Sequence, residues 1–113
     1  MEEYELDAWL GDTEVTDEQR AALHRASDMC AARYGADLED DRTLAFNAAA
    51  QVILGDDTLD AYSVAYAQAR RAERDAMASL TGAIIASSAD MSEVAISTST
   101  GITRMTVRKA LGK

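Results

Sequence analysis

A long run of small and apolar residues, from Thr58 to about Ala86, repeats at the spacing of one face of an α-helix. The chain has no proline to interrupt it, and only 5% of its residues are aromatic. Alanine is abundant, and β-branched residues cluster only near the C-terminus, so the composition favours helices over sheet. We therefore expect an all-α fold with one long helix, in which Gly82 allows a kink or a break near Thr81. The stripe comprises Tyr62, Ala65, Tyr66, Ala69, Ala72, Ala76, Leu80, Ala83 and Ile84.

This stripe has two interpretations, the core of one chain or part of a dimer seam, and the pattern favours neither. Two shorter helices are predicted before it. Thr16 and Gln19 have the spacing of a capping box, which predicts a helix that starts at Thr16 and ends at Gly35 as its C-terminal cap. Its apolar face is predicted to hold Ala22, Leu23, Ala26, Met29 and Cys30.

The second of these helices is expected to follow the acidic turn 37–41 and to end at Gly55. Its predicted apolar side comprises Leu44, Ala45, Ala48, Ala49, Val52 and Ile53. Residues 1–15 are predicted to form an acidic arm with a short turn of structure. The arm would be held by Tyr4, Leu6, Trp9 and Leu10.

The formal net charge of −9 is distributed unevenly. Residues 1–62 hold sixteen carboxylates and four arginines, a balance of −12, whereas residues 63–113 hold four carboxylates and seven basic side chains, a balance of +3. Phosphate would be repelled by the first part and attracted by the second. We therefore predict an acidic helical region over 1–60, for dimerisation or for binding a protein partner, and a separate module over 61–113.

Several classes of function lack the residues that they need. The acidic residues do not follow the order of an EF-hand loop, His24 stands alone, and Cys30 is expected to be a buried, inert thiol. No nucleophile–histidine–acid set, phosphate loop or zinc cluster is present, so we expect no enzyme, no metal site and no cofactor. Neither a secretory signal nor an apolar membrane span is found, which predicts a cytoplasmic protein.

The segment Ser92–Lys113 has the pattern of two short helices joined by a glycine turn. Gly101 provides the residue that tolerates a positive φ, and Ser92 and Thr103 are predicted N-caps. A small core is expected from Ile96, Ile102, Val107, Ala110 and Leu111. Residues 87–91 are the predicted loop before this motif. The C-terminal half of the long helix, with Met77, Leu80, Ile84 and Ile85, is expected to pack on Ile96 and Val107.

The run from Ile96 to Leu111, ISTSTGITRMTVRKAL, resembles the helix-turn-helix of bacterial and phage regulators and of the resolvase-type, homeodomain-like family. The resemblance covers about 35 residues, the C-terminal third of the chain, and departs from the family pattern at Ser97 and Asp90. It implies base contacts from Arg104, Met105 and Lys109. It implies phosphate contacts from Thr103, Thr106 and Arg108, with Ser92 capping the first helix.

These observations predict a small sequence-specific regulator of transcription, most simply a repressor, that binds double-stranded DNA as a homodimer. Two other interpretations remain. The acidic helices would bind a basic protein partner, as small phage- or plasmid-encoded inhibitors do, or the chain would be a DNA-binding accessory protein of recombination.

Overall fold

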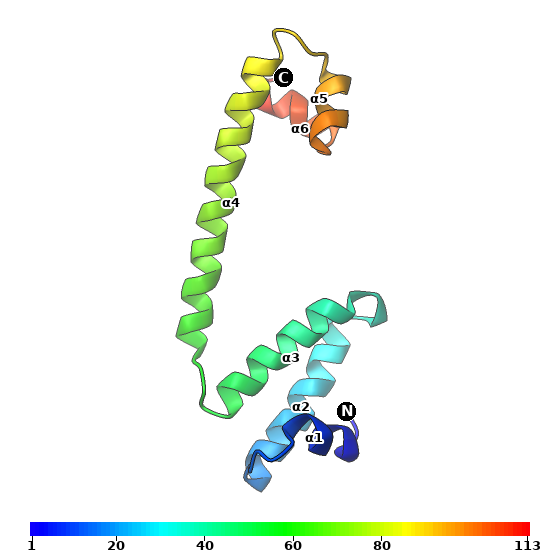
Figure 1. The fold of residues 1–113 in the computed structure, drawn as a ribbon, viewed down its shortest axis with the longest axis vertical. Helices are drawn as coiled ribbons and strands as arrows, with labels where there is room; N and C mark the ends of the chain where they lie inside the picture. The colour runs from blue at the N-terminus through cyan, green and yellow to red at the C-terminus, as the bar shows by residue number, and fades with distance from the viewer. The chain divides into compact units, whose positions relative to one another are not determined.

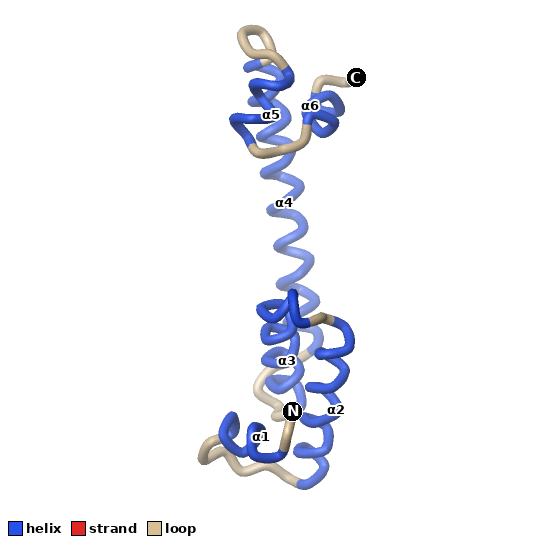
Figure 2. Tube along the Cα trace, turned by 90° about the vertical axis from the view of Figure 1, so that its right-hand side faces the viewer, coloured by secondary structure: helices blue, strands red, loops and turns tan.

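The protein has an all-α fold, as predicted. A computed structural model describes all residues, 1–113, and contains six α-helices, one short 3₁₀-helix and no strand (Figure 1). Loops connect the helices throughout (Figure 2). The chain divides into two compact units, Met1–Ser63 and Val64–Lys113, and the boundary falls inside the long helix α4 (Leu59–Ser87).

In the N-terminal unit, α1 (Glu3–Leu10) packs on α2 (Asp17–Arg33) and α3 (Glu39–Ile53). The predicted arm is therefore largely a helix, and its Leu6 and Leu10 are buried. They join Leu23, Phe46 and Ala50 in one core, and the rings of Trp9 and Phe46 meet edge to face with centroids 5.3 Å apart. Tyr4 was expected to help hold this segment, but its side chain is 72% exposed.

The capping box at the start of α2 is confirmed. The hydroxyl of Thr16 accepts a hydrogen bond from the Gln19 amide at 3.0 Å, and the Gln19 side chain accepts one from the Thr16 amide at 2.9 Å. The prediction for Gly35 is wrong. Tyr34 is the C-cap, and Gly35 has φ −69° and precedes the 3₁₀-helix Ala36–Leu38, so no left-handed residue ends α2.

Two predicted apolar faces were partly wrong. Met29 of α2 is 65% exposed, and in α3 the buried residues are Phe46 and Ala50. Leu44 is 68% exposed and Val52 is 43% exposed. Because α3 carries apolar residues on two sides, periodicity alone did not show which side packs against α1 and α2.

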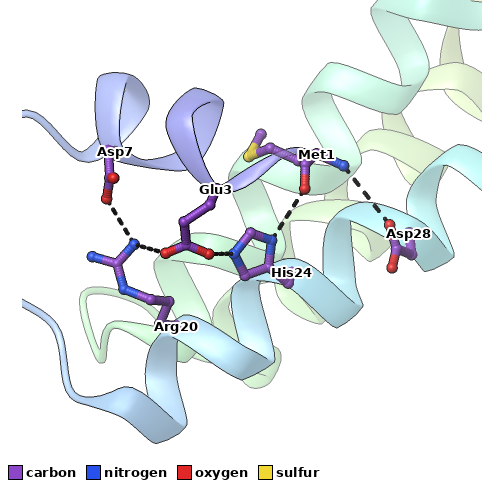
Figure 3. Close-up of polar contacts among 6 residues, drawn as sticks. All are labelled: Met1, Glu3, Asp7, Arg20, His24 and Asp28. Atoms are coloured by element: carbon purple, nitrogen blue, oxygen red, sulfur yellow. Dashed lines mark hydrogen bonds and ion pairs between the residues drawn. The ribbon is translucent and has the colours of Figure 1, made fainter.

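A polar clasp (Met1, Glu3, Asp7, Arg20, His24 and Asp28) fastens α1 to α2 (Figure 3). Arg20 donates to Glu3 at 2.6 Å and to Asp7 at 2.7 Å, while Nε2 of His24 lies 2.6 Å from the second carboxylate oxygen of Glu3. The hydrogen bond with His24 is the main cause of the lowered pKa of Glu3. The hydrogen bond and the charge of Arg20 lower this pKa further. The lone histidine thus serves to position α1.

In the C-terminal unit, the end of α4 packs against α5 (Glu93–Thr100) and α6 (Arg104–Ala110) (Figure 1). Ile84, Ile96 and Val107 are buried, and Leu80, Ile102, Ala110 and Leu111 pack around them, as predicted. Met77 and Ile85 were expected in this core, but they are 44% and 54% exposed. α4 continues as a helix through Gly82, so the glycine does not break it.

Substitution of Leu23 by alanine should lower the free energy of unfolding of the N-terminal unit by about 2–5 kcal/mol, because a fully buried side chain leaves a cavity. Urea unfolding followed by the emission of Trp9, the only tryptophan, measures this loss. The matched control is Met29→Ala on the same helix, whose exposed side chain should change the free energy by less than about 0.5 kcal/mol. Equal effects of the two substitutions would contradict the assignment of the core.

Candidate nucleic-acid interface

The turn between α5 and α6 is formed by the predicted left-handed Gly101 and is fixed by two hydrogen bonds of Ser97. Gly101 has φ +75°, and its amide donates to the Ser97 carbonyl, which closes α5 in a left-handed cap. The Ser97 hydroxyl donates to the carbonyl of Ile102 at 2.6 Å. A small polar residue at 97 therefore holds the chain on both sides of the turn.

Both helices of the motif have side-chain N-caps. The Ser92 hydroxyl accepts from the Ala95 amide at 3.1 Å, and the Thr103 hydroxyl accepts from the Thr106 amide at 3.2 Å. The hydroxyls of Thr103 and Thr106 also lie 3.0 Å apart. The two threonine hydroxyls therefore hold each other in place at the start of α6 without a bound ligand.

The structure places the predicted contact residues of α6 mostly on its exposed side. Val107 is fully buried, which orients the helix, while Met105 is 71% exposed. The side chains of Arg104 and Arg108 are 61% and 48% exposed, and Lys109 is also exposed, whereas Thr106 is half-buried. One face of a two-turn helix thus presents three cations and one flexible apolar side chain.

Glu93, in the first turn of α5, connects these cations, a role that the sequence analysis missed. Its carboxylate accepts hydrogen bonds from Arg108 at 3.0 Å, from Lys113 at 3.1 Å and, at 3.5 Å, from Arg104. The Glu93 side chain is only 15% exposed. The hydrogen bond from Lys113 is the main cause that lowers the pKa of Glu93, and the charge of Arg108 lowers it further.

This Glu93 cluster (Glu93, Arg104, Arg108 and Lys113) holds one negative and three positive groups, so it keeps an excess of two positive charges. Arg108 is oriented by a close ion pair, whereas Arg104 is held loosely and has the larger exposed fraction. The signal for this cluster in the sequence is that Glu93 lies eleven residues before Arg104 and fifteen residues before Arg108. It could not be interpreted before the crossing of α5 and α6 was known.

Other kinds of site find little support in the structure. No group of three or more His, Cys, Asp or Glu side chains is arranged to hold a metal ion. None of the helices combines the length and the apolar character that crossing a bilayer requires.

The chain matches no protein-family model, no curated protein and no solved structure. The interpretation of the C-terminal unit therefore depends on its own geometry.

Replacement of Glu93 by glutamine should change how stability depends on pH. A carboxylate with a lowered pKa stabilises the folded state above its unfolded value of about 4.3, and this contribution is lost as the pH falls through the lower folded value. Wild type should therefore be more stable than E93Q at pH 7, and the difference should shrink below about pH 4.3.

Thermal unfolding followed by circular dichroism between neutral and acidic pH measures this difference. Asp75→Asn is the control, because Asp75 is exposed on α4 and forms no ion pair. A difference between wild type and E93Q that stays constant with pH would rule out the ionised Glu93 cluster as its source.

Proposed function

We propose that this chain is a small sequence-specific DNA-binding regulator of transcription, acting as a repressor in the cytoplasm. The observation that carries the proposal is the outward face of α6, where Arg104, Met105 and Lys109 project beside Arg108. Arginine and lysine can donate to guanine edges in the major groove, and a methionine side chain can contact a thymine methyl group.

The geometry of the C-terminal unit supports the proposal. Two short helices meet at a left-handed glycine turn, and a third helix, the end of α4, completes their core. In helix-turn-helix proteins this arrangement presents the second helix to the major groove. Thr103, Thr106 and Arg108 are proposed to contact phosphates, and Ser92 to contribute beside them through its position at the start of α5.

Charge supports the same assignment. Residues 64–113 carry seven basic and four acidic side chains, while residues 1–63 carry four and sixteen. A unit with a balance of +3 suits the negative duplex, whereas the N-terminal unit, with −12, would be repelled by it. The acidic unit would thus disfavour non-specific binding and leave affinity to the contacts of α6.

A helix of two turns makes few contacts, so we propose that the chain binds DNA as a homodimer that occupies two half-sites. In the N-terminal unit, Val52 and Ile53 of α3 line an apolar groove of about 460 Å³ with Leu59 and Tyr62 of α4. Leu59 is 75% exposed, and the apolar stripe of α4 continues from Tyr62. Such a surface is typical of interfaces between subunits.

A second candidate function is favoured by the charge of the N-terminal unit. The net −12, with Glu39, Asp40 and Asp41 in the first turn of α3, would suit a basic protein partner. In that case the α3–α4 groove would bind the partner, and α6 would control the chain's own promoter. A role as an accessory protein of recombination uses the same DNA contacts and is distinguished by the site that the protein selects.

Arg104→Ala should weaken binding to a selected duplex by about 1–3 kcal/mol and relax the preference at one base pair. Arg108→Ala should instead weaken binding to the selected and the scrambled duplex alike. It should also reduce the salt dependence of binding, since it removes a phosphate contact. Fluorescence anisotropy with the selected site and a scrambled duplex, at several salt concentrations, separates the two effects. Arg70→Ala, an exposed arginine of α4, is the control. If both α6 variants bind the selected duplex as tightly as wild type does, α6 is not the recognition surface.

Leu59→Glu should convert the proposed dimer to monomer, because it places a charge in the apolar groove. The change should leave α4 intact, since an acidic residue in the first turn suits the helix dipole. Sedimentation equilibrium measures the mass. Met29→Glu, an exposed apolar position on α2 that does not line this groove, should remain dimeric. If L59E stays dimeric, the seam lies elsewhere; if wild type is monomeric, the homodimer itself is disproved.

A further inference from the structure

The N-terminal unit contains a second cavity, of about 450 Å³, where its three helices meet. Trp9 of α1 and Phe46 of α3 form an aromatic wall, and their ring planes are inclined by 67°. Cys30 of α2, expected to be buried, is half-buried and adds an apolar surface to this cavity. A volume of a few hundred Å³, aromatic walls and a few polar groups are the usual features of a small-molecule site.

Two unpaired charges of opposite sign line this cavity, those of Arg42 and Glu5. Arg42, on α3, is half-buried, and its guanidinium forms neither an ion pair nor a hydrogen bond with any side chain. Glu5, on α1, is equally without an ionic partner. Arg20, by contrast, is bound by both Glu3 and Asp7. A half-buried arginine without a carboxylate partner is suited to bind one in a bidentate manner.

The charge of the surrounding unit narrows the class of ligand. A balance of −12 over residues 1–63 repels a simple anion, although Arg42 would bind its carboxylate locally. A simple cation would be attracted by the unit but would meet Arg42 in the cavity. A zwitterion carries no net charge, so it avoids the long-range repulsion and still satisfies both charged groups.

We propose that this cavity binds a free amino acid with an apolar or aromatic side chain. Arg42 binds the α-carboxylate, Glu5 binds the α-ammonium, and the side chain lies against Trp9 and Phe46. The ligand would join α1 to α2 and α3, because all three helices contribute to the walls. The site belongs to the N-terminal unit and stands whether or not the chain binds DNA.

Titration of the full chain with L-phenylalanine tests the proposal through two reporters that line the cavity. Trp9 is the only tryptophan, and Cys30 is the only cysteine. We expect a saturable change in Trp9 emission and slower alkylation of Cys30 by iodoacetamide, with a dissociation constant of about 1 mM or lower. 3-Phenylpropanoate and phenethylamine each lack one charged group of L-phenylalanine and should bind about tenfold more weakly.

Variants identify the charged contacts. Arg42→Gln should weaken the binding of L-phenylalanine about tenfold, while Arg25→Gln, an exposed arginine of α2 outside the cavity, should bind like wild type. Glu5→Gln changes an exposed side chain that has no ionic partner, so this variant should fold like wild type. It therefore tests the site even if R42Q folds poorly. This variant should bind L-phenylalanine more weakly and 3-phenylpropanoate as well as wild type does. The proposal is overturned by the absence of a saturable response, by equal binding in R42Q and R25Q, or by 3-phenylpropanoate binding as tightly as L-phenylalanine.

Discussion

The contact among Ile84, Ile96 and Val107 determines the arrangement of the C-terminal unit. These three side chains, one from each helix, are nearly or fully buried, and they are the only buried residues of that unit. Val107 faces inward, so Met105 and Lys109, two positions away on either side, project from the opposite side of α6. The exposure of Met105 and Lys109 is thus a direct consequence of where one valine packs.

Ion pairs with Glu93 further restrict the side chains around α6. Glu93 holds Arg108 and Lys113 close and Arg104 loosely, so the cations around α6 are oriented before any ligand arrives. Preorganised side chains lose less conformational entropy on binding. The same carboxylate competes with phosphate for these cations, which would lower non-specific affinity. In the N-terminal unit, Arg20 fulfils the corresponding structural role between Glu3 and Asp7.

Features that depend on neighbouring residues could be predicted from the sequence. The capping box of Thr16 and Gln19, the left-handed Gly101 and the packing of Leu80 and Ile84 all follow from local spacing, and the structure contains each of them. Apart from the C-terminal cap expected at Gly35, the expectations that were wrong concern which side of a helix is buried. Leu44 and Phe46 lie on different sides of α3, and only the packing of α1 showed that Phe46 is buried. Glu93 was missed because its partners are distant in the sequence.

The identity of any DNA site cannot be derived from the fold, since base preference depends on side-chain contacts with a particular duplex. The most direct test of the central claim is selection of bound sequences from a random duplex pool by the full-length protein at moderate salt. The proposed function predicts enrichment of a palindrome or repeat whose half-sites lie about one helical turn apart. A pool that stays random after repeated selection would contradict sequence-specific binding by α6.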